Sequence, residues 1–513
     1  MSDELKPAIR ARIDVIRKKK KMLPFEKWRN IGKIVVADLK EGGRFFNTTQ
    51  GLFVFDEPQR RTFPLTKNPG LCAVFNERYG INPREHGFDR VLADLETEAQ
   101  LHGEKVEIRR FAHYEKDNGC LYVSRFDGHV YRLNGTSVES VHNGTDNVFF
   151  DDHPNWEPYC YCPNTSRGKV NDLLIESVNY SSGHLSIEDQ RKLFNLWLLA
   201  LFFGSLQPTK IILLLLGEHG SGKTSALRRI QKFLFGDKVD LLSIEKEKPD
   251  GFIATVTSDP VALFDNLDEK ISWLPYNLSR LATGVSFPRR QLYTTNTKVE
   301  YPGVCWLGIT ARTVRFMQEQ EDLPDRTLVL KLDRLEKIRP EAELLAAVSQ
   351  HRDVLWSEIL DNLNCIVQHL SHAPASSPLH FRMADFAALS LSISSVWDWQ
   401  EEVERAFEKL EHAQAELIFE DDPIHQVLRF WLNEPGNEGR TVDAGTLQVE
   451  WSQIAAKNHI DWPFKNGRSL GQRLGQLRHA FQLSVDMKVS EDLHAKQKLY
   501  SFRLRESRDA KPP

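Results

Sequence analysis

The chain has 513 residues, of which 41% are hydrophobic and 27% are charged. A chain of this length exceeds what one hydrophobic core supports, so we expect several globular domains and exclude a largely disordered protein. The formal net charge of −4 gives no overall attraction to nucleic acid, so a DNA-binding role requires a local basic surface.

The start of the chain is polar and basic, with four consecutive lysines at residues 18–21. No apolar core with a cleavage site follows them, which excludes a secretory signal. The most apolar stretch, residues 193–216, is interrupted by Gly204, Pro208 and Lys210, whereas a membrane span needs about 20 continuous apolar residues. We therefore expect a cytoplasmic protein with no membrane partner.

Residues 1–165 are expected to form a mixed, β-rich N-terminal accessory domain. Turn signals such as Asn134-Gly135 separate short alternating segments, for example residues 129–133, and this spacing is typical of antiparallel hairpins. Residues 88–102 are predicted to form one helix inserted among the strands. The domain is a candidate for binding an accessory protein.

Residues 166–345 are expected to form the α/β core. Ser186, with Asp189 three residues later, predicts a capping box that opens the apolar helix at residues 193–203. Pro208 then resets the chain before an apolar strand, and apolar strands alternate with helices or loops up to about residue 332.

The strand leads into the sequence G-E-H-G-S-G-K-T at residues 217–224, which is a nucleotide-binding loop. Its glycines let backbone N–H groups turn toward a phosphate, the following helix directs its positive N-terminus there, and the lysine reaches the β- and γ-phosphates. We expect ATP with Mg²⁺; the alternative is a glycine-rich turn with an incidental lysine. The expected nucleotide contacts are Gly217, Gly220, Ser221, Gly222, Lys223, Thr224 and Ser225, with Thr224 also a Mg²⁺ ligand.

A second apolar strand, residues 261–264, is followed by Asp265. A carboxylate at this position can hold Mg²⁺ opposite Thr224, although a strand-end aspartate can also simply cap the next turn. Asn266 stands where an acidic residue commonly activates the attacking water. Asp268 is our candidate for that role, and Glu269 is the alternative.

A third apolar strand ends at Thr310, where a polar side chain can sense the γ-phosphate from between the first two strands. Arg326 stands just before a further strand. In a ring-forming ATPase an arginine here faces the γ-phosphate bound by the neighbouring subunit. The alternative for Arg326 is a surface salt bridge with Asp325 or Glu321.

In their order and spacing these motifs resemble the ring-forming AAA+ ATPases related to superfamily 3 helicases and to the primase-helicases of viruses, phages and plasmids. The resemblance rests on residues 264–268, 289–296, 307–313 and 325–328. It implies a hexamer with ATP sites between subunits and a hairpin, at about residues 289–301, that grips DNA in the central pore. Arg289, Arg290 and Lys298 would contact phosphates there; a solvated basic turn is the alternative.

Residues 346–421 are expected to form a helical lid or linker, and residues 422–513 a winged-helix domain, because three helical segments precede two alternating ones. Leu470, Leu474, Leu477 and Phe481 share one face of the third predicted helix, residues 469–481. Polar side chains lie elsewhere on it, although winged helices also contact proteins. The DNA-binding candidates here are Lys465, Arg468, Arg473 and Gln476.

The whole pattern predicts a multidomain α/β protein that acts as an ATP-driven DNA motor of the helicase or translocase type. We expect it to form a hexameric ring on single-stranded or forked DNA in mobile-element replication or a phage-related process. The alternative is an AAA+ switch, loader or scaffold that unwinds nothing, for example in a phage-defence system. The basic hairpin favours the motor, whereas the acidic sequence at residues 317–322, where relatives often carry arginines, favours the alternative.

Overall fold

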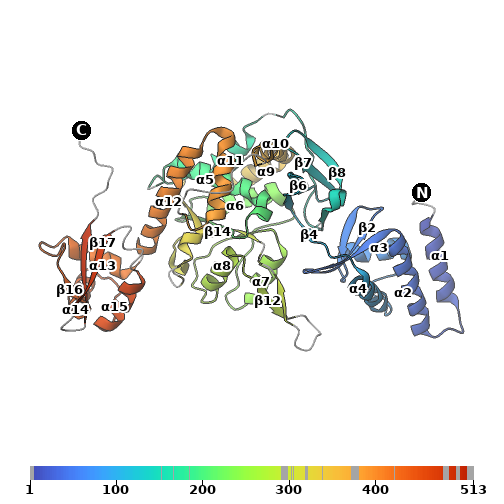
Figure 1. Cartoon of the computed structure of the whole chain (residues 1–513), viewed down its shortest axis with the longest axis horizontal. Helices are drawn as coiled ribbons and strands as arrows, with labels where there is room; N and C mark the ends of the chain where they lie inside the picture. The colour runs from blue at the N-terminus through green and yellow to red at the C-terminus, as the bar shows by residue number, and fades with distance from the viewer. Residues whose placement is uncertain are drawn as a thin grey trace.

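The structure is a computed structural model, and it shows a mixed α/β protein with several separate sheets. It describes residues 5–151, 153–165, 167–183, 185–290, 298–301, 303, 305–317, 320, 322–337, 339–370, 381–420, 422–477, 485–492 and 497–504. Figure 1 shows an elongated molecule with a central body between an N-terminal lobe and a C-terminal lobe. Among the described helices, none combines the length and the apolar content that crossing a membrane requires.

The N-terminal lobe packs four helices against a three-stranded antiparallel sheet of order β1-β2-β3. Its core includes Ile13, Val35, Phe75 and Phe88. The predicted helix at residues 88–102 is confirmed, whereas the other three helices were not anticipated. The elements are α1 (Leu5–Lys18), α2 (Pro24–Glu41), β1 (Gly43–Thr48), β2 (Gly51–Asp56), β3 (Arg61–Pro64), α3 (Pro69–Tyr79) and α4 (Phe88–His102).

A four-stranded antiparallel sheet of order β5-β6-β7-β8 follows, which confirms the predicted hairpins. Leu121 and Tyr131 of this sheet belong to the same hydrophobic cluster as Trp197 and Trp356 of the central body. The packing therefore joins this sheet to the central body, while the division at residue 165 stays a prediction. The strands of this sheet are β5 (Ala112–Glu115), β6 (Cys120–Ser124), β7 (His129–Leu133) and β8 (Val138–His142). A separate two-stranded parallel sheet is formed by β4 (Ile108–Arg109) and β9 (Phe149–Phe150).

The central body is built on a parallel sheet of order β11-β14-β10-β15. Side chains alternate between its faces: Leu213 and Leu215 of β10 enter one hydrophobic cluster, and Leu214 and Leu216 enter another. Both faces are thus buried. As predicted, β14 lies between the strand before the glycine loop and the strand before Asp265. The strands are β10 (Ile212–Gly217), β11 (Val261–Phe264), β14 (Trp306–Ala311) and β15 (Thr327–Leu332), with a separate hairpin of β12 (Phe287–Arg290) and β13 (Lys298–Tyr301).

Helices cover the two faces of this sheet. One face lies against α5 and α6, and the other against α7 and α8. Ser186 caps α5 in the predicted capping box with Asp189. These helices are α5 (Ile187–Ala200), α6 (Lys223–Phe235), α7 (Pro249–Ser258) and α8 (Leu274–Ala282). Short helical turns are η1 (Thr145–Asn147), η2 (Asn171–Ile175), η3 (Leu201–Leu206), η4 (Arg315–Met317), η5 (Pro324–Arg326) and η6 (Ser395–Trp397).

The helical segment after the sheet confirms the predicted change of pattern and adds α11, which the sequence did not indicate. Buried Arg352 at the start of α10 donates to the carbonyl oxygens of Phe233 (3.0 Å) and Leu234 (3.2 Å) at the end of α6. This contact satisfies carbonyls that a helix end leaves free and fixes α6 against α10. The helices are α9 (Glu341–Gln350), α10 (Arg352–Leu370), α11 (Ala384–Ser394) and α12 (Gln400–Glu420).

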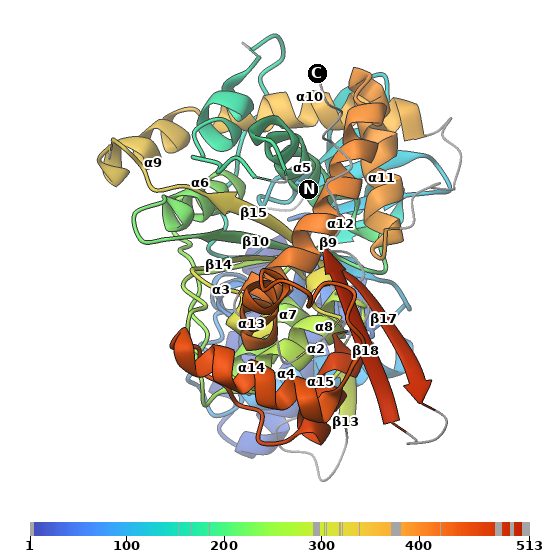
Figure 2. The same cartoon turned by 90° about the vertical axis from the view of Figure 1, so that its left-hand side faces the viewer.

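The C-terminal lobe has its own hydrophobic cluster, which includes Trp431, Trp451, Leu474 and Phe502. Three helices lie beside an antiparallel sheet of order β16-β18-β17, and Figure 2 shows β17 and β18 extending as a long hairpin. The predicted order of elements is confirmed, and Phe481 lies outside the described residues. The elements are α13 (Pro423–Leu432), β16 (Val442–Asp443), α14 (Ala444–Lys457), α15 (Gly467–Gln476), β17 (Val485–Asp492) and β18 (Gln497–Leu504).

Candidate nucleotide-binding site

The glycine loop makes a sharp turn from the end of β10 into the start of α6. Gly220 and Gly222 have φ values of 77° and 83°, in the left-handed region that glycine enters without a steric penalty. The loop delivers the chain to the first turn of α6, where backbone N–H groups without helical partners and the positive helix dipole favour an anion. Ser225 Oγ, also in this turn, is buried with no hydrogen-bond partner among the described residues.

Lys223, the first residue of α6, folds back over the loop. Its Nζ donates to the carbonyl oxygens of Gly217 (2.5 Å) and Glu218 (2.9 Å) and to Ser221 Oγ (3.3 Å). Ser221 is buried and donates in turn to the Glu218 carbonyl at 2.9 Å. Burial lowers the pKa of Lys223, and the carboxylates of Asp268 and Asp265 oppose that shift. A phosphate bound in the loop would give this ammonium a stronger partner than neutral carbonyl oxygens.

Asp265 lies directly after β11 and gathers hydroxyl groups from two other elements. Thr224 Oγ1 of α6 donates to Asp265 Oδ1 at 2.9 Å, and Thr310 Oγ1 of β14 donates to the same oxygen at 2.6 Å. Thr310 Oγ1 also accepts from the backbone N–H of Asn266 at 2.8 Å. The neighbouring strands β11, β10 and β14 therefore bring three predicted site residues together at the carboxyl edge of the sheet.

Asn266 has a left-handed backbone with a φ of 58°. Asparagine tolerates this conformation better than most residues, and strain of this kind concentrates at functional sites. The turn leads the chain away from Asp265 toward Asp268. It gives a local reason for asparagine at this position, independent of any role in activating water.

The residues present fit ATP with Mg²⁺. Thr224 and Asp265 supply the hard oxygen ligands that Mg²⁺ takes, and in the described chain both hydrogen bonds to the Asp265 carboxylate fall on Oδ1. Oδ2 is therefore open to a further partner. Bound Mg²⁺ would neutralise charge on the β- and γ-phosphates.

Asp268 is already engaged by Arg312, which follows β14. Asp268 Oδ1 accepts from the Arg312 backbone N–H at 2.7 Å, and Oδ2 accepts from Arg312 Nε at 2.5 Å. Arg312 Nη1 lies 2.8 Å from Nε2 of His219 in the glycine loop. The sequence did not single out Arg312 or His219 as site residues, because they are 93 positions apart and meet only when β10 pairs with β14.

Arg326 lies at the end of the strands opposite to the glycine loop. It precedes Thr327, whose partner in β10 is Ile212, whereas Gly217 is paired with Leu332. Five strand residues span about 16 Å at the usual rise per residue, so Arg326 cannot reach the glycine loop of the same chain. Its side chain donates to the Ser279 carbonyl at 2.8 Å and pairs with Asp322 at 2.7 Å.

The hairpin predicted at about residues 289–301 is present as β12 and β13, while its contact with DNA stays a prediction. Its antiparallel register pairs Arg290 with Lys298 and Arg289 with Val299, and residues 291–297 lie outside the described chain. In the C-terminal lobe, Lys465 and Arg468 are exposed near the start of α15, in which Gln476 is the last residue. Arg473 is instead paired with buried Asp422 at 3.1 Å, so it is less available than Lys465 and Arg468.

We expect Thr310→Val to raise the Mg²⁺ concentration needed for half-maximal ATP hydrolysis by about 10-fold, because a group that orients a metal ligand is typically worth that much or more. The change removes the hydroxyl that holds Asp265 and leaves the Asn266 N–H without its acceptor. A Mg²⁺ titration of the ATPase rate measures the effect. Thr313→Val is the matched control, and an unchanged Mg²⁺ dependence in Thr310→Val would contradict the role.

These features define the central body as an α/β domain in which a glycine loop connects a buried strand to the start of a helix. Residues 172–402, which carry the whole site, match the family described as the actinomycete integrative conjugative element replication protein. The match covers less than half of the 513 residues. No curated protein matches the chain significantly.

Two solved structures are similar to most of the chain at low identity. The one described as SCCmec type IV Cch, an active helicase, is 13% identical over 88% of this chain and 90% of its own, with a TM-score of 0.45. The apo C-terminal region of NrS-1 is 12% identical over 91% of this chain and 98% of its own, with a TM-score of 0.41.

Proposed function

We propose that this protein is an ATP-dependent DNA motor of the helicase or translocase type that serves replication of a mobile element. The observation that carries the proposal is the meeting of Thr224, Asp265 and Thr310 beside the Lys223 loop. A P-loop NTPase uses such a set to hold the β- and γ-phosphates and Mg²⁺. The match of residues 172–402 to a replication protein family supports a role in the replication of a mobile element.

In this proposal the active form is a hexameric ring with ATP between subunits. The position of Arg326 at the sheet edge away from its own loop supports action on a neighbour's nucleotide. Head-to-tail contacts of one kind close into rings. The β12–β13 hairpin would contact DNA in the centre, and the C-terminal lobe would bind DNA as a winged helix through Lys465 and Arg468.

We assign different roles to Thr310 and Arg312 within the site. Buried Thr310 orients Asp265 through its hydroxyl, which makes it a positioning residue. Arg312, held by Asp268 and turned toward His219, is the better candidate for contacting the γ-phosphate in the same subunit. Asp268 then serves to hold Arg312, and its candidacy as the group that activates water becomes weaker.

The alternative is an ATP-dependent switch, loader or scaffold that does not unwind DNA. The observation that favours it is the engagement of both Asp268 oxygens by Arg312, together with Asn266 beside Asp265. Of the carboxylates that follow Asp265 in that segment, exposed Glu269 is then the one left to activate water, and it is one residue farther from Asp265 than Asp268 is. An ATPase with slow hydrolysis can still change its assembly or its partners when it binds nucleotide.

Displacement of a labelled strand from a forked DNA substrate tests the proposal, with the ATPase rate measured with and without single-stranded DNA. The motor predicts ATP-dependent displacement and a DNA-stimulated rate. A DNA-responsive ATPase that displaces no strand would support the alternative. An ATPase rate that DNA leaves unchanged, with no displacement, would contradict the motor.

A further inference from the structure

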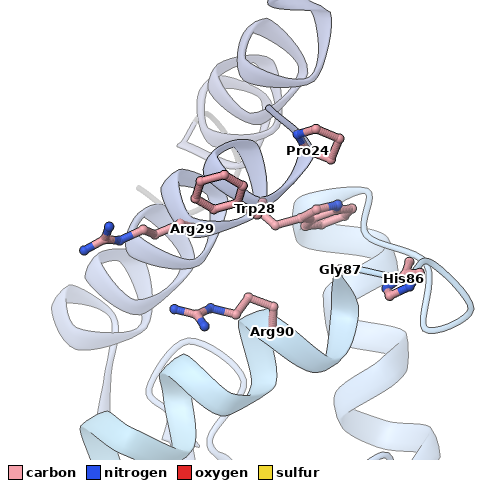
Figure 3. Close-up of a pocket in the computed structure, with 7 residues that line it drawn as sticks. Pro24, Trp28, Arg29, His86, Gly87 and Arg90 are labelled. Atoms are coloured by element: carbon pink, nitrogen blue, oxygen red, sulfur yellow. The ribbon is translucent and has the colours of Figure 1, made fainter. Parts of the chain in front are cut away.

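A pocket of about 560 Å³ lies in the N-terminal lobe between the start of α2 and the start of α4. Its volume is within the range, about 300–1,000 Å³, of pockets that hold small organic ligands. Figure 3 shows Arg29 of α2 and Arg90 of α4 extending to one side, while Trp28 points the other way toward Gly87 and His86. The lining residues are Pro24, Phe25, Trp28, Arg29, His86, Gly87 and Arg90.

The two aromatic side chains of the pocket differ in how they are held. A Cβ atom at Gly87 would lie 1.8 Å from Trp28 Cδ2, so the indole packs directly on a glycine backbone. Arg17 Cζ lies 5.6 Å from the centre of the Trp28 ring. The Trp28 ring is therefore held in place and forms a wall of the pocket. Phe25 is 64% exposed, so its ring is open to a flat partner.

Positive charge accumulates beside these rings. A second hollow of about 380 Å³ shares Arg29 and Arg90 with the pocket and continues along α2 and α4 past Lys33 and Lys40. Its two carboxylates are neutralised within the hollow, since Asp94 pairs with Arg90 at 3.5 Å and Glu98 with Lys40 at 2.7 Å. Arg29 and Lys33 have no carboxylate partner in the described part of the chain.

Further lysines shortly precede the pocket residues Pro24 and Phe25 in the chain. Residues 18–21 are all lysines, exposed at the end of α1 and in the turn that leads to Pro24. Asp89, which precedes Arg90, is paired with Lys67 at 2.6 Å. Glu26, which accepts from the Leu23 N–H at 3.2 Å, is the one acidic residue among residues 18–33. The local charge is thus positive although the whole chain is slightly acidic.

We propose that this surface, an exposed Phe25 with the unpaired cations Arg29 and Lys33 beside it, binds single-stranded DNA. A base would stack on Phe25 against the Trp28 wall, and the backbone would follow the hollow between α2 and α4. Duplex DNA hides its base faces, and an acidic peptide offers charge without flat rings, so an unpaired strand fits both features. The site lies in a lobe separate from the nucleotide site and requires no ATP hydrolysis, so it goes beyond the motor proposal.

Photocrosslinking of the full-length wild-type chain locates the site directly. An oligothymidine strand carrying 5-iodouracil is irradiated with the protein in the absence of nucleotide, and the crosslinked peptides are mapped by mass spectrometry. We expect a crosslink in the peptide that contains Phe25 and Trp28. Crosslinks confined to other segments, such as the β12–β13 hairpin or the C-terminal lobe, would overturn the proposal.

Affinity measurements on variants test the chemistry. Phe25→Ala is expected to bind oligothymidine about 10-fold more weakly, in the range for loss of one stacked base. Arg29→Ala with Lys33→Ala is expected to reduce the slope of log affinity against log salt by about 1.4, at about 0.7 per phosphate contact. Leu101→Ala, at an equally exposed apolar residue of α4, and Lys105→Ala are the matched controls.

Two competitors separate stacking from simple charge attraction. An abasic oligomer of the same length should bind the wild-type chain more weakly than oligothymidine and be insensitive to Phe25→Ala. Equal competition by polyglutamate would identify an acidic-peptide surface and overturn the DNA assignment. Repeating the measurements in Lys223→Ala separates this site from the motor, since a chain without ATP turnover should keep the crosslink and the affinity.

Discussion

Lys223→Ala is expected to lower the maximal rate of ATP hydrolysis by at least about 100-fold, which is the usual loss when one preorganised donor to developing charge is removed. The ammonium stands at the first residue of α6, beside the loop that turns through Gly220 and Gly222. In the proposed motor it would contact the phosphates, whose charge grows on the transferred group and its bridging oxygen in the transition state. Alanine leaves that charge without its partner.

Phosphate release at saturating ATP and Mg²⁺ measures this loss, and binding of a fluorescent ATP analogue separates weaker binding from slower chemistry. Lys232→Ala is the matched control, because Lys232 lies on the same helix and pairs with Asp237 outside the site. Thermal unfolding should be similar for both variants. Turnover at the wild-type rate in folded Lys223→Ala protein would refute the assignment of the loop as the nucleotide site.

The parts of the fold that the sequence predicted are those that local signals specify. Asn134-Gly135 sits in the turn between β7 and β8, where the chain needs the left-handed conformation that glycine provides. The apolar run before Gly217 could only be a buried strand once the loop and the helix beginning at Lys223 followed it. Such signals extend over a few residues, so they can be recognised without knowledge of distant contacts.

The parts that the sequence did not predict depend on packing between distant segments. The β5–β8 sheet joins the central body through Tyr159, which donates to the Ser124 carbonyl of β6 at 2.8 Å and stacks on Trp356 at 3.8 Å between ring centres. The pocket of the N-terminal lobe depends on Trp28 meeting Gly87, 59 positions away, with no pattern that marks either residue. Hydrophobic periodicity identifies a buried face but not the partner that covers it.

The candidate site likewise has residues that the sequence predicted and residues that it did not. Motif spacing was sufficient to select Thr224, Asp265 and Thr310, because a parallel sheet brings the carboxyl ends of neighbouring strands to one edge. The contact of Arg312 with Asp268 and His219 depends on side-chain directions after a left-handed turn at Asn266, which the sequence does not specify. The signal available in the sequence was Arg312 itself, an arginine directly after a strand and two residues beyond Thr310, the predicted sensor of the γ-phosphate.

Arg326→Ala is expected to lower ATP turnover by about 1,000-fold in the assembled protein, the lower end of what an arginine finger contributes. Arg326 is 13% exposed and donates to Ser279 while pairing with Asp322, so it must leave these partners to act on a neighbour's nucleotide. Removing it leaves Asp322 with hydrogen bonds from Ser279 and Gln320, so the segment should stay folded. Arg382→Ala is the matched control, since Arg382 pairs with Asp325 at 2.9 Å and with Asp322 at 3.9 Å, so this change removes a neighbouring cation from the same carboxylate and leaves Arg326 in place.

Mixing Arg326→Ala with Asp265→Ala protein decides whether the arginine acts between subunits. Each variant alone lacks one half of every site. In a random ring about a quarter of the head-to-tail interfaces combine an intact Asp265 with an intact Arg326 from the neighbour, so the mixture should regain activity that neither variant has. If the mixture hydrolyses ATP no faster than the average of the two separate variants, Arg326 is a structural partner of Ser279 and Asp322. Recovery instead requires a nucleotide site completed by the next subunit, because the sheet holds Arg326 about 16 Å along the strands from its own loop.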